Sequence, residues 1–317
     1  MHAPRTRVQR RPVHGVLLLD KPLGLSSNDA LQKCKWLLRA EKAGHTGTLD
    51  PLATGVLPLC FGAATKFSQL QLEADKAYEA VVRLGLRTTT ADAEGEVLGD
   101  EQPVPQLTPE LLAEVTRRFS GPLRQLPPMH SALKKDGKAL YEYARAGLEV
   151  EREPRDVVVH ALALSVIDAQ TLHMAATVSK GTYIRTLGED IGQALGCGGH
   201  LRALRRVRTG DLDVVQCVTL AALEEMEPAD RLACLQPPES LLAGHTRVTL
   251  GMEDAARFLS GLRRRGAWPN ASQVAVYGPD QSLLGTAHTM AGELIPGRLL
   301  SPIEIQQISS SKEPQEA

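Results

Sequence analysis

The sequence predicts a mixed α/β (α+β) protein that carries a small β-rich domain near its C-terminal end. Segments rich in aliphatic and β-branched residues alternate with segments whose apolar residues recur at helical spacing. The composition changes near "LQPPESLLAGHTRVTL", after which short strand-like segments are separated by glycine and proline. With 317 residues, the chain is long enough for one large domain and a smaller one.

These changes in composition divide the chain into successive parts. We expect a flexible basic tail at residues 1–13, a main domain at 14–245, a β-rich domain at 246–306 and a disordered tail at 307–317. Within the main domain, residues 124–155 are rich in proline and lysine, which predicts a mobile, partly basic excursion from the core.

Each element of the main domain has a local reason. A buried apolar run predicts the first strand, and Ser26 or Ser27 can cap the helix after it, as Thr108 can cap a later one. The elements expected in the first half are a strand at 15–24, a helix at 26–40, a loop around Asp50, a strand at 76–86 and a helix at 108–121. Those expected in the second half are a short helix at 138–147, paired strands at 155–169 and 171–181, a helix at 182–196, a strand at 212–220 and a helix at 219–226. The small domain is expected to begin with a helix at 252–262.

Charge and motif content exclude several classes of protein. The net charge of −1 excludes a uniformly basic nucleic-acid coat, although local arginine clusters such as "HLRALRRVRTG" fit one docked polyanion or a solvated face. Five irregularly spaced cysteines without a CxxC pair indicate a reducing cytoplasm and no disulfide framework. The apolar run "GVLLL" is too short to span a membrane. We therefore expect no membrane association. Because "CGGH" lacks the second half of a zinc site and phosphate-binding glycine motifs are absent, we expect neither metal nor cofactor.

The stretch "AGHTGTLDPLATGVLPL" sets Asp50 among glycines and small residues. Pro51 disfavours a helical conformation for Asp50, and the glycines allow another molecule to approach closely. A carboxylate before proline is also a common way to start a helix, with aspartate as the cap. These residues alone allow either a functional carboxylate or a helix cap.

The segment "SKGTYIRTLGEDIG" places Lys180, Tyr183 and Arg185 at the start of a helix. An arginine near the positive end of the helix dipole is poorly placed for capping, so a fixed carboxylate or a phosphate explains Arg185 better, the alternative being a surface arginine. Tyr78 alternates with Ala80 along a predicted strand, which fits either a core-facing ring or a ring in a binding site.

Four segments together resemble the TruB family: "GVLLLDKPLGLSSNDALQKCK", "GHTGTLDPLATGVLPLCFGAATKFSQ", "SALKKDGKALYEYAR" and "SKGTYIRTLGEDIG". The resemblance extends from about Gly15 to Val218 and is weaker beyond it. Members are bacterial synthases that isomerise the T-loop uridine of tRNA, conventionally numbered 55, to pseudouridine. The resemblance implies a pseudouridine-synthase fold with a mixed, largely antiparallel sheet and flanking helices. It also implies a C-terminal PUA-like RNA-binding domain and an insertion at 124–155 that closes over RNA.

The resemblance also implies roles for individual residues. Asp50 matches the catalytic nucleophile, Arg185 the arginine that pairs with it, and Tyr78 the ring that packs on the target base and assists proton removal. The residues implied in substrate binding are His45, Tyr78, Tyr183 and Leu204. Weaker candidates for contacts with the RNA backbone are Lys21, Lys66, Lys134, Lys180, Arg202 and Arg205. His130 stands where many relatives have tyrosine, which puts one contact of the insertion in doubt.

We therefore expect a cytoplasmic, monomeric, cofactor-free isomerase that acts on tRNA without a guide RNA. Its Asp50 would be ionised, with a bidentate Arg185 holding the pKa of Asp50 down against burial. Attack on the sugar, attack on the base and abstraction of a sugar proton all remain open as chemical routes. A glycoside hydrolase is disfavoured because no second carboxylate accompanies Asp50. A tRNA-folding activity stays open, either as an alternative or in addition.

Overall fold

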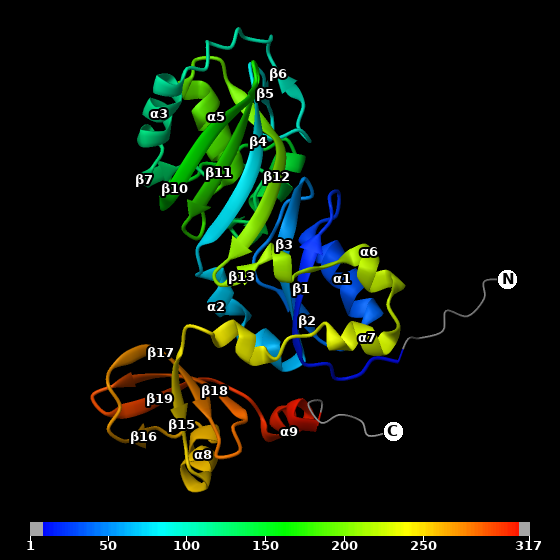
Figure 1. Ribbon diagram of the computed structural model, residues 1–317, viewed down its shortest axis with the longest axis vertical. Coiled ribbons are helices and arrows are strands. Elements are labelled where there is room, and N and C mark those ends of the chain that lie inside the picture. The colour runs from blue at the N-terminus through cyan, green and yellow to red at the C-terminus, as the bar shows by residue number, and fades with distance from the viewer. Residues whose placement is uncertain (1–8, 311–317) are drawn as a thin grey trace, which may run out of the picture.

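The computed structural model describes residues 9–310, and its largest feature is a long twisted sheet (Figure 1). Within these residues the sheet has ten strands, in the order β14-β1-β3-β12-β4-β11-β10-β7, with β2 added to β3 and β13 to β12. Its strands are β1 (Gly15–Lys21), β2 (Ala43–His45), β3 (Ala53–Phe61), β4 (Lys76–Leu84), β7 (Gly121–Gln125), β10 (Arg155–Asp168), β11 (Thr171–Val178), β12 (Gly199–Thr209), β13 (Leu212–Asp213) and β14 (Val218–Thr219). Only the pairs β1–β14 and β3–β12 are parallel, which confirms a mixed, largely antiparallel sheet.

Helices flank the sheet, and several begin where the sequence predicts. They are α1 (Ser27–Leu37), α2 (Ser68–Leu72), α3 (Pro109–Arg118), α4 (Leu140–Arg145), α5 (Ile184–Ala194), α6 (Leu220–Glu225) and α7 (Pro228–Ala233), with 3-10 turns η1 (Gly62–Lys66), η2 (Val214–Gln216) and η3 (Pro238–Leu242). Ser26, Thr108 and Thr219 cap α1, α3 and α6 by accepting a backbone N–H, as predicted for the first two. No helix within the described residues is long and apolar enough to cross a membrane.

Two strands of the sheet centre were not predicted. The region of β3 was assigned to the Asp50 loop because Gly55 and Pro58 resemble turn residues. Gly55 instead has a φ of +100° and approaches β12 so closely that a β-carbon would lie 2.1 Å from the Arg206 carbonyl oxygen. The arginine run of β12 was treated only as a basic patch. Conversely, the strand predicted at 212–220 is two short strands separated by η2.

The main core lies between the sheet and its helices. Leu17, Leu19, Leu57, Leu59 and Val82 are completely buried within it. The strands β1 and β3 read as continuous apolar runs because both of their faces are covered. The two small hairpins outside the main sheet are β5 (Arg87–Thr88) with β6 (Val97–Leu98), and β8 (Lys134–Lys135) with β9 (Lys138–Ala139). The second hairpin and α4 lie in the middle of the excursion predicted at 124–155.

The β-rich C-terminal domain is present as predicted (Figure 1). Its elements are β15 (Thr246–Thr249), α8 (Met252–Leu259), β16 (Arg264–Arg265), β17 (Ala271–Tyr277), β18 (Leu283–Met290), β19 (Glu293–Leu299) and α9 (Pro302–Ser310). Its sheet has the order β15-β17-β18-β19-β16. A shared cluster that includes Val16, Phe67, Ala275 and Leu300 packs this domain against the main domain.

The expected tails are shorter than predicted where the structure describes them. Residues 307–310 belong to α9 rather than to a disordered tail. At the other end, the Arg11 N–H donates to the Arg39 carbonyl at 2.8 Å and Val13 is buried, so residues 11–13 are anchored. The expectations for residues 1–8 and 311–317 fall outside the described part of the chain.

Candidate active site

Asp50 starts a tight turn that leads directly into β3. The Ala53 N–H donates to the Asp50 carbonyl at 3.0 Å, and Pro51 occupies the second position of the turn, where its fixed φ is favourable. No helix begins at Pro51, so the helix-cap interpretation of Asp50 is wrong. The turn instead presents the carboxylate at the end of a buried central strand.

The loop that follows β1 holds this turn in place. The Ser27 hydroxyl accepts from the Leu49 N–H at 2.7 Å and donates to the Leu49 carbonyl at 3.0 Å. The Lys21 ammonium donates to the carbonyls of Leu25 at 2.6 Å and Pro51 at 3.4 Å. Lys21 is completely buried, and this burial lowers its pKa to about 8. Because the side chain of Lys21 has no exposed surface, the structure gives no support to its predicted contact with the RNA backbone.

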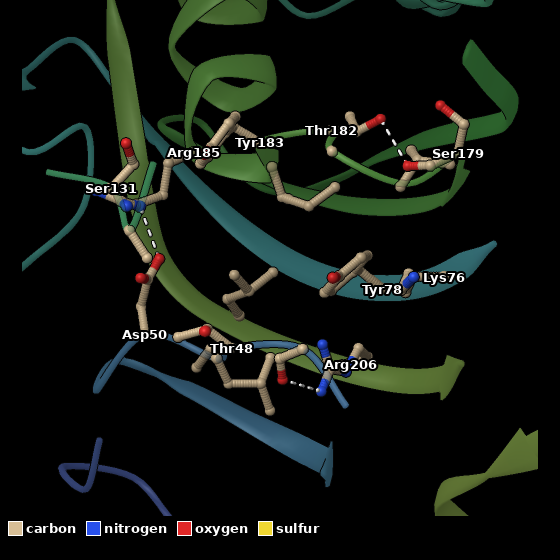
Figure 2. A pocket seen from close by; sticks show the side chains of 18 of the residues that line it. Thr48, Asp50, Lys76, Tyr78, Ser131, Ser179, Thr182, Tyr183, Arg185 and Arg206 are labelled. Atoms are coloured by element: carbon tan, nitrogen blue, oxygen red, sulfur yellow. Dashed lines mark hydrogen bonds and ion pairs between the residues drawn. The ribbon is translucent and has the colours of Figure 1, made fainter. Parts of the chain in front are cut away.

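Arg185 connects Asp50 to three other segments (Figure 2). It is the second residue of α5, and its Nε lies 2.9 Å from Asp50 Oδ2 and 3.6 Å from Asp92 Oδ2. Nη1 donates to the Thr90 carbonyl at 3.0 Å, and Nη2 donates to the His130 carbonyl at 2.6 Å. The guanidinium therefore contacts Asp50 through one nitrogen rather than as the expected bidentate fork. Its other nitrogens fix it to the loop before β6 and to the predicted insertion.

Asp92 is a site residue that the sequence interpretation missed. Its side chain is only 3% exposed, and it accepts hydrogen bonds from the Thr90 hydroxyl at 2.5 Å and the Glu94 N–H at 3.0 Å. The stretch "TTTADAEG" is typical of an acidic surface turn, so the sequence pattern does not indicate that Asp92 is buried. The available signal was the run of threonines before it, since short hydroxyl side chains commonly satisfy a buried carboxylate.

The electrostatics of the pair differ from the expectation. Burial raises the pKa of Asp50 above its ordinary value of 3.8, and Asp92 raises it further, while Arg185 and Lys21 act in the opposite direction. Arg185 lowers the pKa of Asp50, as predicted, but burial and Asp92 outweigh it, so the pKa lies above its usual range rather than below it. Arg185 is shared between two carboxylates, which weakens its effect on either one.

A cavity of about 560 Å³ opens beside this pair, within the range of about 300–1,000 Å³ usual for ligand sites. Tyr78 of β4, Tyr183 before α5 and Leu204 of β12 line it together with Asp50 and Arg185 (Figure 2). Gln125 holds the Tyr183 backbone by accepting its N–H at 3.0 Å and donating to its carbonyl at 3.3 Å. The structure thus brings five sequence-predicted residues around one cavity.

His45 lies apart from the lining of this cavity. It ends β2 opposite Leu59, and its side chain is partly buried. Burial lowers the pKa of His45, with a further decrease from Arg206, which favours a neutral ring. The predicted role of His45 in substrate binding therefore stays a prediction, since His45 does not belong to the lining of the cavity.

The basic residues predicted to contact RNA have different environments. Lys66 pairs with Glu304 of α9 at 2.6 Å and also donates to the Leu299 carbonyl, so it ties the C-terminal domain to the main domain. Arg205 forms a bidentate ion pair with Asp20, with N–O distances of 3.0 and 2.7 Å, and Lys180 pairs with Glu73. Lys134 and Arg202 are exposed.

Two further basic residues in the cavity were not predicted. Arg206 and Lys76 both line it and are both buried, at 2% and 8% exposure. Lys76 donates to backbone carbonyls at the end of α2, and burial lowers its pKa to about 8. Within residues 9–310, no cluster of three or more histidine, cysteine or acidic side chains is arranged to hold a metal ion.

Comparison with known proteins identifies the family of the chain. The model of the TruB family pseudouridylate synthase N-terminal domain matches residues 35–184, and that of the tRNA pseudouridylate synthase B C-terminal domain matches residues 185–243. A protein of Verminephrobacter eiseniae named tRNA pseudouridine synthase B is 66% identical, over 98% of this chain and 96% of its own. A protein of Ralstonia nicotianae with the same name is 60% identical, over 92% of this chain and 95% of its own.

Solved structures with a similar fold come from larger assemblies. A chain in the crystal structure of a Cbf5-Nop10-Gar1 complex superposes with a TM-score of 0.70 at 25% identity, over 92% of this chain and 87% of that one. A chain in an H/ACA ribonucleoprotein bound to a substrate RNA containing 2′-deoxyuridine superposes with a TM-score of 0.69 at 23% identity, over 92% of this chain and 86% of that one. The match confirms the fold, and the curled C-terminal sheet is consistent with the PUA-like domain.

Proposed function

The chain belongs to the TruB family of tRNA pseudouridine synthases, and we propose that it converts the T-loop uridine conventionally numbered 55 with Asp50 at the reacting centre. The observation that carries the proposal is the Asp50–Arg185 pair at a cavity lined by Tyr78 and Leu204. The cavity is large enough for a nucleotide turned out of its stack, and its aliphatic and aromatic walls suit a flat base.

The reaction breaks the N1–C1′ bond of uridine and forms a C5–C1′ bond. A proton leaves C5 and N1 gains one, so no oxidant or energy source is consumed. Unstacking the base costs on the order of a few kcal/mol, which contacts to the surrounding RNA must offset. Tyr78 stacks against the base in this proposal and assists removal of the C5 proton.

The carboxylate of Asp50 acts in its ionised form. Its side chain is 38% exposed towards the cavity, so it can reach a substrate. Asp92 is buried and interacts with Arg185 instead. Arg185 orients Asp50 and favours the carboxylate over the acid. Attack on C1′, attack on the base and abstraction of a sugar proton all begin from this ionised carboxylate.

We further propose that the protein acts as a monomer in the cytoplasm and needs no guide RNA. The supporting observation is that Asp50, Arg185, Tyr78 and Leu204 all come from this one chain. In this proposal residues 124–155 close over the RNA, since the carbonyl of His130 already reaches Arg185.

The test is pseudouridine formation on a bare synthetic T-stem-loop RNA, followed by base-specific chemical mapping. Wild type should form product, and Asp50→Asn should bind the RNA without forming product. Asp168→Asn, at the exposed end of β10, is the matched control and should react like wild type. Product from Asp50→Asn at a near wild-type rate would contradict the role of Asp50. A tRNA-folding activity that survives in Asp50→Asn would be a second function, separate from the chemistry.

A further inference from the structure

Arg206 is a buried cation without an anionic partner. Its Nε donates to the Val56 carbonyl at 2.8 Å and its Nη2 to the Gly47 carbonyl at 3.4 Å. Across residues 9–310, no carboxylate pairs with this guanidinium and no acceptor binds its Nη1. Buried arginines are rarely left unpaired, because removing the charge from water is costly unless an anion or a full set of acceptors replaces the water.

The neighbours of Arg206 increase its need for an anion. Lys76 is also buried, and its ammonium already donates to three backbone carbonyls at and just after the end of α2. After burial, the positive charge of Arg206 is the next cause that lowers the pKa of Lys76. Arg206 lowers the pKa of His45 as well. Lys76 is therefore saturated with acceptors but still adds positive charge to this end of the cavity.

The arginine faces the same cavity as the reacting pair. In Figure 2, Asp50 and Arg185 lie at the left of the cavity, and Lys76 and Arg206 lie at the right. Gly47 lies beside Nη1, and because it has no side chain only its backbone covers the guanidinium there; a β-carbon at this position would lie in van der Waals contact with Nη1, at 3.8 Å. The cavity therefore has a carboxylate at one end and an unsatisfied guanidinium at the other.

We propose that Arg206 binds a phosphodiester group of the RNA at the end of the cavity opposite Asp50. This inference rests on the proposed function, because an RNA nucleotide at Asp50 brings its flanking phosphates into the same cavity. A phosphate oxygen would accept from Nη1, while the Val56 and Gly47 carbonyls keep the guanidinium in one orientation. A neutral carbonyl of the base could also accept from Nη1, but it would leave the buried charge uncompensated.

The experiment measures equilibrium RNA binding in an Asp50→Asn background, so that no product forms. The T-stem-loop RNAs carry one neutral methylphosphonate at a time, at each linkage next to the target uridine. One such linkage should weaken binding about 10- to 100-fold when Arg206 is present, as expected for a hydrogen bond to a charged group. Arg206→Met should bind the unmodified RNA as weakly as the protein with Arg206 binds the RNA that carries the neutral linkage. The neutral linkage should not weaken RNA binding by Arg206→Met any further.

Arg208→Met is the matched control, since Arg208 is an exposed arginine on the same strand and does not line the cavity. It should keep the full effect of the neutral linkage. Arg206→Met also loses two carbonyl contacts, so thermal unfolding must first establish that it folds. If it does not, Arg206→Lys replaces it and should reduce the effect of the linkage, because lysine lacks the planar fork.

Two results would overturn the inference. The first is that no neutral linkage weakens binding to the protein that carries Arg206. The second is that the same linkage weakens binding equally with and without Arg206. The second result would indicate a purely structural role in holding Gly47 and Val56. Both results are distinct from failure of the proposed function, in which wild type forms no pseudouridine or no T-stem-loop RNA binds.

Discussion

Replacing Asp92 by asparagine tests how two carboxylates share Arg185. Asp92→Asn keeps the size of the side chain and an oxygen that can accept from the Thr90 hydroxyl and the Glu94 N–H. It removes the negative charge that raises the pKa of Asp50. The pKa of Asp50 should therefore fall, and the ionised carboxylate should persist to lower pH.

The distances set the size of this change. Asp50 Oδ2 and Asp92 Oδ2 lie 2.9 and 3.6 Å from the same Arg185 nitrogen, so they are at most about 6.5 Å apart. At an effective dielectric constant of about 20, two unit charges at this separation repel by about 2.5 kcal/mol. Because Asp50 is 38% exposed towards the cavity, water screens part of this repulsion, so the pKa of Asp50 should fall by less than the full repulsion implies.

The assay is the single-turnover rate of pseudouridine formation as a function of pH. In wild type the rate should fall as the pH drops through the raised pKa of Asp50, since the protonated form is inactive. In Asp92→Asn the acid limb should move to lower pH, because the charge that raises the pKa of Asp50 is gone. The plateau rate should also fall, because a neutral amide orients Arg185 less firmly. Asp168→Asn serves as the control without a shift. An acid limb that stays in place or moves to higher pH would refute the argument.

Three other substitutions follow from the same geometry. Lys21→Met should lower the single-turnover rate without changing the salt dependence of RNA binding, because Lys21 is buried; a smaller salt slope would contradict this. Asp50→Asn should melt at a higher temperature than wild type at neutral pH, because a raised pKa of Asp50 means that its ionised form destabilises the fold. Below a pH of about 4 Asp50 is protonated in both the folded and the unfolded protein, so the difference in melting temperature should vanish. A lower melting temperature of Asp50→Asn at neutral pH would contradict this. Gly55→Ala should lower the free energy of unfolding in urea by at least about 2 kcal/mol, because the new β-carbon would clash with the Arg206 carbonyl and a φ of +100° is strained for alanine. An unchanged urea midpoint would contradict the close approach of β3 and β12.

The helices could be predicted because their signals are local. Ser26 and Thr108 start α1 and α3 through contacts with residues only three positions away. The strand β3 could not be predicted in the same way, because Gly55 and Pro58 resemble turn residues when read along the chain. Their strand conformation depends on β1 and β12, which lie on either side of β3 in the sheet. Local patterns therefore predicted the class of fold but missed two of its central strands.

The site shows the same division between local and distant signals. Asp50, Arg185 and Tyr78 were each ambiguous as single residues, and only the resemblance of whole segments connected them. The contacts of Arg206 with Val56 and Gly47 span 150 and 159 positions, so no local pattern indicates them. Lys21 was assigned to the surface for a related reason. A lysine in a proline turn usually faces water, and its enclosure here depends on the packing of the Asp50 turn over it.

The ionised state of Asp50 depends on the cations around it. When a base fills the cavity, it displaces the water that now reaches 38% of this side chain, and further desolvation raises the pKa of Asp50. Arg185 and Lys21 are the groups that oppose this rise. The pKa of Lys21 is itself lowered to about 8, so its support is complete only below that pH. A phosphate bound close to Asp50 would add a further negative charge to those of Asp50 and Asp92 and suppress the ionisation of Asp50. Placing the phosphate at Arg206, across the cavity, holds the RNA backbone while leaving the charge balance at Asp50 to Arg185, Asp92 and Lys21.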